Sequence, residues 1–330
     1  MREEQALLEA HGLKKYFLQN KSLSAAKRTY VKAVDDVAQS IREGETLGLV
    51  GESGCGKSTL GRLLLRLIEP TEGSIRYRGV DIAGLNAKEM RQMRRKMQMI
   101  FQDPYAALNP RMTVLETIQA PLDAFGLGSK REREEKVLRI MASVGISENN
   151  LYRYPHEFSG GQRQRMVIAR ALVLDPEFVV CDEPVSALDV SVRSQVINLM
   201  DDLQKEYRLT YLFISHDLSV IRHICDRVAV MYLGQIVELA ENDALYERPG
   251  HPYTRALLSA IPLPDVDGKK NRILLEGDVP SPLNPPQGCR FHTRCRYATS
   301  ACAAEQPPLR EVEPGHWVAC HYCGEEMQEP

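Results

Sequence analysis

Short apolar runs alternate with turns over the first 50 or so residues and with helical segments further along the chain. Val34–Ile41 and Thr46–Val50 are typical of strands separated by a polar turn, and a helix is expected from Lys57 to about Ile68. Four further runs also predict strands: Ser74–Tyr77, Met97–Phe101, Phe178–Cys181 and Tyr211–Ile214. Helical segments follow the last two runs, so the pattern predicts parallel strands with crossover helices and an α/β fold.

Helical periodicity also covers Arg111 to Ser147, where the charged stretch Lys130–Lys136 is expected to face solvent. The pattern changes after Arg248, because 12 of the 19 prolines lie beyond it and no long periodic segment remains. We therefore predict one large domain over residues 1–265 and a small extension, rich in cysteine and proline, over 266–330.

Composition indicates which kinds of partner, nucleic acid or membrane, the chain can bind directly. Hydrophobic residues make up 43% of the 330 positions, enough for a full core, and the formal net charge is −2. A sequence-nonspecific nucleic-acid binder usually has a strongly basic balance, so no nucleic-acid partner is expected. No apolar run approaches the roughly 20 residues that cross a bilayer, and the acidic N-terminus does not resemble a signal peptide. We expect a cytosolic chain whose link to a membrane is made by a partner.

Residues 51–58 fit the pattern G-x-x-x-x-G-K-[ST], between a predicted strand and a predicted helix. Its backbone N–H groups would form a nest for phosphate, aided by the dipole of the following helix. Lys57 can reach the β and γ phosphates, and the Ser58 hydroxyl can bind Mg²⁺ with Thr59 beside it. A chance glycine-rich turn would not have this context. The nucleotide-binding residues predicted here are Gly51, Glu52, Ser53, Gly54, Cys55, Gly56, Lys57, Ser58 and Thr59.

Two carboxylates follow the apolar run at 178–181. Asp182 stands at the carboxyl end of a predicted buried strand, where it can hold Mg²⁺, and Glu183 can polarise the attacking water. Alternatively, the pair caps the next helix. His216 follows another strand and is predicted to contact the γ-phosphate, although a lone histidine is often structural.

Ser159, Gly160, Gly161 and Gln162 open a helix and form a second candidate anion nest. It begins 159 − 57 = 102 residues after Lys57, and no second phosphate loop accompanies it. A second phosphate-binding element without its own loop suggests a site that another chain completes.

With these residues in place, the chain resembles the ATP-binding-cassette (ABC) family. Phe158 to Gln162 is similar to the family's Leu-Ser-Gly-Gly-Gln signature, and Ser186–Asp189 resembles its D-loop. The resemblance implies a phosphate-loop ATPase fold with an antiparallel β subdomain and a helical signature subdomain. It also implies a head-to-tail dimer that sandwiches ATP and Mg²⁺. The resemblance also implies roles for three further residues. Gln102 would be the Q-loop glutamine that senses Mg²⁺, and His216 the switch histidine. Tyr16 would stack on adenine, with the adjacent Phe17 as the alternative.

A closer resemblance is to the oligopeptide and dipeptide importer ATPases. It is carried by Phe101–Pro104, Tyr154–Glu157, His251–Thr254, and the tail from Asp278 to His292. It implies a paralogous partner ATPase, two permease subunits and a periplasmic or lipid-anchored solute-binding protein. The chain would then sit at the cytoplasmic face of the inner membrane. Dipeptides, longer peptides and nickel all remain possible solutes.

Five of eight cysteines crowd the tail, which in a reducing compartment suggests metal more than disulfide. Cys289, Cys295, Cys302 and Cys320 could hold an iron–sulfur cluster or zinc. The family resemblance favours [4Fe–4S]. The Cys320-x2-Cys323 pair keeps zinc open, and plain structural thiols are the third reading. The other three cysteines are expected to be small buried residues: Cys55, Cys181 and Cys225.

Two rival functions fit less well. A soluble cassette ATPase acting in DNA repair or translation would need an inserted coiled coil or a second cassette, and the sequence has neither. An inactive cassette would lack one or more of the residues needed for hydrolysis, and all four are present here: Lys57, Asp182, Glu183 and His216. The residues predicted to act in catalysis are Glu183, His216, Gln102 and Lys57.

Overall fold

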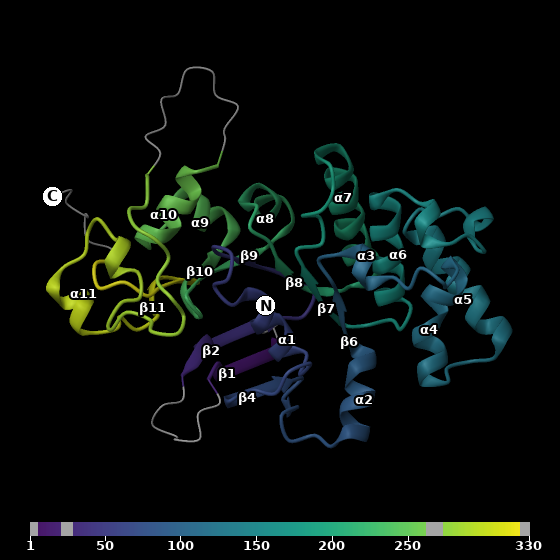
Figure 1. Ribbon diagram of the computed structural model, residues 1–330, viewed down its shortest axis with the longest axis horizontal. Helices are drawn as coiled ribbons and strands as arrows, with labels where there is room; N and C mark the ends of the chain where they lie inside the picture. The colour runs from purple at the N-terminus through teal and green to yellow at the C-terminus, as the bar shows by residue number, and fades with distance from the viewer. Residues whose placement is uncertain (1–5, 21–28, 262–272, 324–330) are drawn as a thin grey trace. The chain divides into compact units, whose positions relative to one another are not determined.

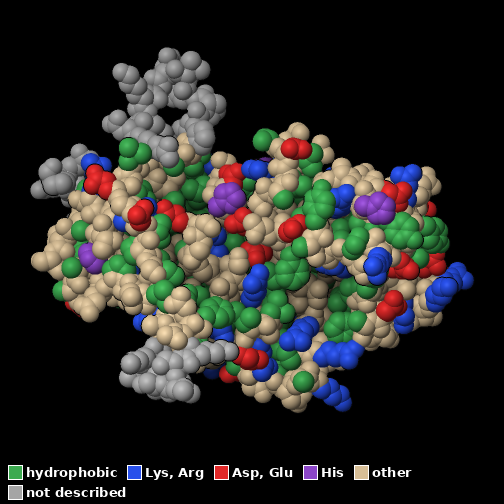
Figure 2. Space-filling view, in the orientation of Figure 1, with side chains coloured by type: hydrophobic (Ala, Val, Ile, Leu, Met, Phe, Trp, Pro, Cys, Tyr) green, Lys and Arg blue, Asp and Glu red, His purple; other side chains and the backbone are tan. Residues whose placement is uncertain are grey.

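Figure 1 shows the computed structural model, which describes residues 6–20, 29–261 and 273–323. These residues divide into two compact units. Unit 1 contains residues 42–46 and 84–214, and unit 2 contains the described parts of 6–41, 47–83 and 215–323. The predicted boundary between 265 and 266 lies outside the described residues. Within those ranges, no helix is both long and apolar enough to span a bilayer. Acidic and basic side chains are interspersed on the face in Figure 2.

Unit 1 is built on three parallel strands, β6 (Met97–Ile100), β7 (Phe178–Asp182) and β8 (Thr210–Ile214). The central strand β7 pairs with both neighbours, and all five of its residues are buried. This explains its unbroken apolar run, because a strand covered on both faces does not alternate. In the register, Ile100 lies beside Cys181, and Cys181 beside Phe213, so the three strands end at one edge.

The helices of unit 1 are α2 (Ala87–Lys96), α3 (Pro104–Ala107), α4 (Val114–Phe125), α5 (Lys130–Ser143), α6 (Gly160–Leu172) and α7 (Val190–Tyr207). Short 3₁₀ turns lie at Glu148–Asn150 and Pro155–Glu157. The helical pattern after Arg111 is confirmed, as two helices: Gly126 ends α4 in the left-handed region, and Ser129 caps α5. These helices form the helical part of the unit that carries residues 159–162.

The antiparallel sheet of unit 2 has the order β2 (Tyr30–Arg42), β1 (Ala6–Leu18), β4 (Glu72–Tyr77) and β5 (Val80–Asp81). The predicted runs at 34–41 and 74–77 lie inside β2 and β4. Strand β1 was not predicted, because its pairing with β4 shifts between His11 and Lys14 and its alternation is broken there.

A second group of strands in unit 2 has the order β11 (Arg310–Glu313), β12 (His316–Val318), β10 (Gln235–Glu241), β9 (Arg227–Tyr232) and β3 (Thr46–Val50). Only β3 and β9 pair in parallel. The helices of the unit are α1 (Lys57–Leu64), α8 (Leu218–Ile224), α9 (Asn242–Glu247), α10 (Pro252–Ser259) and α11 (Ser300–Ala304), with a 3₁₀ turn at His292–Arg294. Helix α1 ends before the predicted Ile68, because Arg66 adopts a left-handed φ of 48°.

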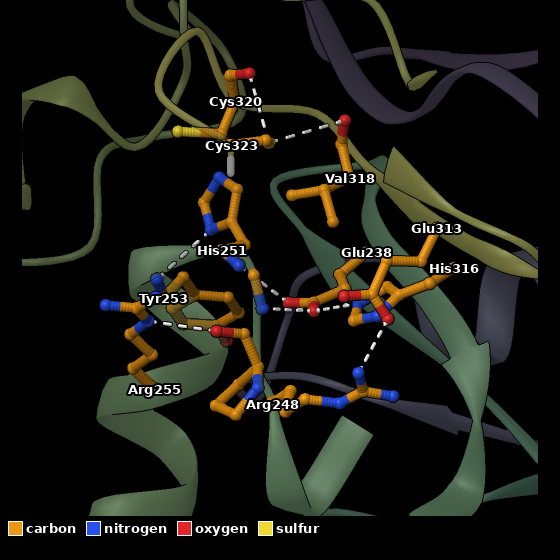
Figure 3. A network of polar contacts seen from close by, with 12 residues as sticks. Glu238, Arg248, His251, Tyr253, Arg255, Glu313, His316, Val318, Cys320 and Cys323 are labelled. Carbon is orange, nitrogen blue, oxygen red and sulfur yellow. Dashed lines mark hydrogen bonds and ion pairs between the residues drawn. The ribbon is translucent and has the colours of Figure 1, made fainter. Parts of the chain in front are cut away.

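The C-terminal extension is part of this sheet. Strand β12 pairs with β10, with Val318 opposite Glu238. The Glu238 side chain of β10 is fully buried. Its carboxylate accepts hydrogen bonds from the His316 ring, as Figure 3 shows, and from the backbone N–H groups of Gly250 and His251. The extension is therefore joined to β10 by both backbone and side-chain bonds.

Candidate nucleotide site

The phosphate loop of unit 2 leaves the buried strand β3 and enters α1. Lys57 is 5% exposed, and its Nζ donates to the carbonyls of Gly51 (2.7 Å) and Glu52 (3.0 Å). The ammonium thus lies across the mouth of its own loop, where a phosphate oxygen can replace these backbone acceptors. Burial raises the pKa of the Cys55 thiol, in line with the small buried residue that the sequence predicts.

Two glycines of the loop are fixed by their surroundings. A Cβ at Gly51 would lie 2.2 Å from the Met231 carbonyl oxygen, and one at Gly56 would lie 2.1 Å from that of Ala33. Both also have positive φ, of 152° and 111°. The loop can therefore follow this path only without side chains at these positions.

Glu52, the second residue of the loop, is held from the C-terminal side of the chain. Its N–H donates to the Tyr253 hydroxyl (2.8 Å), and its two carboxylate oxygens accept from the Arg294 guanidinium at 2.8 and 3.2 Å. A two-point bond between arginine and carboxylate fixes orientation as well as distance. The start of the loop is thus anchored by α10 and by the extension.

In unit 1, the carboxylates come from the end of β7. Asp182 is 3% exposed, and Glu183 has a left-handed φ of 47°. The Glu183 N–H donates to the carbonyl of Ile214 (3.0 Å), and Gln102 Nε2 donates to Glu183 Oε2 at 3.1 Å. Gln102 stands two residues beyond β6, so adjacent parallel strands bring the amide and the carboxylate together. Such unusual backbone geometry on a non-glycine residue is characteristic of functional sites.

Residues 159–162 open helix α6 with an exposed tip. Ser159 is the N-cap, and it forms a reciprocal capping box with Gln162. Ser159 and Gln162 are exposed, whereas Gly161 is buried and its Cβ would lie 2.3 Å from a Val192 methyl on α7. Gly161 is therefore required for packing inside unit 1, while Gly160, whose Cβ would meet Leu188 at 3.5 Å, is not.

Comparison with known proteins decides the family. The ABC transporter family model matches residues 34–186, and that of the C-terminal region of oligopeptide/dipeptide transporters matches 237–302. A putative oligopeptide transport ATP-binding protein, YkfD of Bacillus subtilis, is 57% identical over 96% of this chain and 95% of its own. The chain belongs to the oligopeptide/dipeptide branch of the ABC-transporter ATP-binding subunits.

Other relatives of this ABC subunit agree. A putative peptide import ATP-binding protein of Brucella ovis is 56% identical over 96% of the chain and 98% of its own. Among solved structures, the cassette MJ0796, as a dimer with ADP and Pi, has a TM-score of 0.63 and 28% identity over 71% of this chain and 98% of its own. CbiO1 of Clostridium perfringens has a TM-score of 0.65 and 25% identity over 74% and 92%. The predicted family, the ABC ATPase cassette fold and the ATPase class are thereby confirmed.

Two further residues expected in the nucleotide site of this ABC subunit lie in unit 2. The half-buried Tyr16 in β1 donates its hydroxyl to Asp35, with Lys32 Nζ 5.5 Å from its ring centroid. Burial, followed by the bond to Asp35, raises the Tyr16 pKa. His216 is exposed, one residue after Ser215, whose N–H donates to Leu49 in β3 (3.2 Å). His216 therefore follows a segment bonded to the strand that leads into the phosphate loop.

The four tail cysteines predicted as ligands line one small cavity: Cys289, Cys295, Cys302 and Cys320. Cys289 N–H donates to the Cys302 carbonyl (2.8 Å), and a Cβ on Gly288 would lie 2.3 Å from that same oxygen. None of the eight cysteines, all of which lie within the described residues, forms a disulfide. Nevertheless, over residues 6–20, 29–261 and 273–323, no three His, Cys, Asp or Glu side chains are arranged to hold a single metal ion.

The prediction missed Arg290, Arg294, Asp35 and Tyr253. Arg290 donates to Asp35 and to the Leu233 carbonyl. Arg294 and Tyr253 both bind Glu52. The only available signal was the position of two arginines between Cys289 and Cys295, and no spacing rule links such residues to a loop 242 positions away.

Proposed function

We propose that this chain is the ATP-hydrolysing, energy-coupling subunit of a peptide importer. The observation that carries the hydrolytic role is the 3.1 Å contact between Gln102 and Glu183, directly after the buried Asp182. A glutamine amide that holds the carboxylate can keep it directed at a water molecule. This arrangement is what phosphoryl transfer to water requires.

The protein's part in hydrolysis is positioning and charge. Lys57 exchanges its bonds to Gly51 and Glu52 for phosphate oxygens, and His216 contacts the γ-phosphate. Glu183 orients the attacking water and accepts its proton. The residues that we assign to Mg²⁺, which would neutralise charge on the phosphates, are Ser58, Gln102 and Asp182.

The exposed tip Ser159–Gln162 supports a site that a second ATPase subunit completes. Its Ser159 hydroxyl and helix N-terminus suit a phosphate presented by another chain. We propose a paralogous ATPase as that partner. ATP-dependent closure of the pair would then move the attached permease subunits.

Replacing Glu183 by Gln tests the catalytic assignment. The change keeps the shape and removes the base, so turnover should fall by about 10²–10⁴-fold while ATP binding is retained. Glu177→Gln is the matched control, because Glu177 lies just before β7 and pairs with Lys96 (3.1 Å). Wild-type turnover in purified Glu183→Gln protein would contradict the assignment.

The peptide solute is supported by the names of the relatives and by the match over residues 237–302. We propose attachment at the cytoplasmic face of the inner membrane through two permeases served by a solute-binding protein. Nickel is the alternative solute. Co-purification of the tagged chain from membranes, followed by mass spectrometry and uptake of labelled peptide or nickel, tests both. Recovery without permeases would refute the transport role.

We also propose a [4Fe–4S] cluster on the four tail thiols, with zinc as the alternative. Four free thiols lining one cavity fit the donor set of either group, and burial raises the pKa of Cys289 and Cys295 to about 11, so binding must displace their protons. Bound metal would stabilise a tail with little core of its own. Analysis of iron, sulfide and zinc in wild type and in Cys302→Ser, together with visible absorption, distinguishes the [4Fe–4S] cluster from zinc. Wild-type protein that is free of metal after purification without oxygen would refute both the cluster and zinc.

A further inference from the structure

The loop from Cys289 to Cys295, here called the arginine loop, carries two buried cations. The side chains of Arg290 and Arg294 are each 7% exposed. Neither charge points into the cavity lined by the cysteines. Both point at residues that support the phosphate loop or Tyr16, all within unit 2.

Arg294 is bonded to the first turn of the phosphate loop through the Glu52 carboxylate. The guanidinium holds both carboxylate oxygens, Tyr253 takes the Glu52 N–H, and Lys57 Nζ is bound to the Glu52 carbonyl. Every polar group of Glu52 therefore has a partner, and two of these partners lie C-terminal to residue 250. Since Lys57 must leave this carbonyl to bind phosphate, the orientation of Glu52 affects how readily it does so.

Arg290 acts through a different set of contacts in the same unit. It binds one oxygen of Asp35, whose other oxygen accepts the Tyr16 hydroxyl. It also binds the Leu233 carbonyl in the turn between β9 and β10. The next residue, Gly234, donates to the Cys55 carbonyl (2.8 Å) and accepts from the Asp35 N–H (2.9 Å). One cation thus connects Tyr16 with the turn that supports the phosphate loop.

An aromatic cluster holds the arginine loop in place. Phe291 is 2% exposed, and its ring centroid lies 5.3 Å from that of Tyr232 and 5.4 Å from that of Tyr253. Tyr253 is the same residue that accepts the Glu52 N–H. Edge-to-face and tilted pairs of aromatic rings stabilise a loop by more than their buried area alone would.

We propose that Arg290 and Arg294 are positioning residues for ATP, so that the C-terminal extension is a working part of the nucleotide site in its own chain. Arg294 sets the phosphate end through Glu52, and Arg290 sets the adenine end through Asp35 and Tyr16. The proposal rests on the assignment of residues 51–58 to phosphate and of Tyr16 to adenine.

The test measures ATP affinity of the full chain with a fluorescent ATP analogue, using ATP and inorganic tripolyphosphate as competitors. Arg294→Gln should weaken both competitors about tenfold, equivalent to about 1.4 kcal/mol. Arg294→Lys, which keeps one charged bond, should recover part of the loss. Arg290→Gln should weaken ATP more than tripolyphosphate, because it releases Tyr16 as well as the turn beside the phosphate loop. Arg290→Lys is the substitute if Asp35, having lost its partner, prevents folding of Arg290→Gln.

Controls separate positioning from mere stability. Arg296→Ala removes an exposed arginine directly after the arginine loop, where it lies over the Tyr297 ring, and this variant should bind ATP as wild type does. Glu52→Gln combined with Arg294→Gln should be no worse than either alone, because both act through one contact. Unchanged affinity in folded Arg294→Gln, or additive losses in the double variant, would overturn the proposal. Lys57→Ala reports separately: retained ATP binding there would defeat the phosphate-loop assignment itself.

Discussion

Glu238 offers a stringent test of how the extension is joined to the core. Its side chain is fully buried in β10 and accepts from three donors: Gly250 N–H at 2.6 Å, His316 Nε2 at 2.7 Å and His251 N–H at 2.9 Å (Figure 3). Glu238→Ala would leave all three without this partner. Each buried donor left unpaired costs about 1–3 kcal/mol.

The total should be smaller than the sum. Two of the three donors, Gly250 and His316, line a cavity of roughly 430 Å³, from which water can reach part of the gap that Glu238→Ala would leave. We therefore expect Glu238→Ala to destabilise unit 2 by about 3–5 kcal/mol, the range found when one partner of a buried pair is removed. Arg248→Ala is the control from the same network, because its 3.0 Å bridge to Glu313 joins side chains that are 63% and 47% exposed. That bridge is worth at most about 1 kcal/mol.

Hydrogen exchange read by mass spectrometry suits this test, because a chain of two units need not unfold in one step. Peptides covering 235–241, 250–254 and 316–318 should exchange about a hundredfold faster or more in Glu238→Ala, at roughly 1.4 kcal/mol per factor of ten. Peptides from β6 to β8 in unit 1 provide the internal reference. Equal exchange rates of these peptides in Glu238→Ala and Arg248→Ala would show that the buried carboxylate does not hold the extension to β10.

Three other predictions concern single positions. Gly288→Ala should lower the free energy of unfolding by about 1–3 kcal/mol, because φ is 66° and the new Cβ would collide with the Cys302 carbonyl oxygen. Gly277→Ala, at φ 76° with open space around it, should cost less, and equal costs would contradict this reason. Gly161→Ala should lower the unfolding midpoint through its contact with Val192, whereas Gly160→Ala should not. Burial lowers the His251 pKa to about 4, and its Nδ1 accepts from the Tyr253 N–H, so the folded state favours neutral imidazole. Stability should therefore be complete above about pH 6.5 and fall toward pH 4 as the unfolded chain takes up the proton; His251→Asn, which keeps an acceptor, should flatten that dependence.

What could be predicted from the sequence depended on locality. The path from β3 through Gly51–Gly56 into α1 was predictable, because strand, turn and helix signals lie within 20 residues of one another. The approach of Gln102 to Glu183 was predictable in outline, since parallel strands end at one edge. The Arg294–Glu52 bond was not, because any exposed acidic residue could have partnered that arginine. Strands β9 and β10 were also missed, although Arg227–Tyr232 is buried throughout, as the predicted strand β7 is.

The pairing of β12 with β10 has a consequence for shortened versions of the chain. Ile236, Val237, Leu239 and Ala240 are buried along β10, and β12 covers the outer row of backbone groups beside them. In a chain cut at residue 265, β10 would become an exposed edge strand with buried apolar residues beside its unpaired backbone groups. Exposed edge strands pair with strands of other molecules. We therefore expect a chain without the tail to form oligomers and precipitate, in addition to losing the contacts that Arg290 and Arg294 make with Asp35 and Glu52.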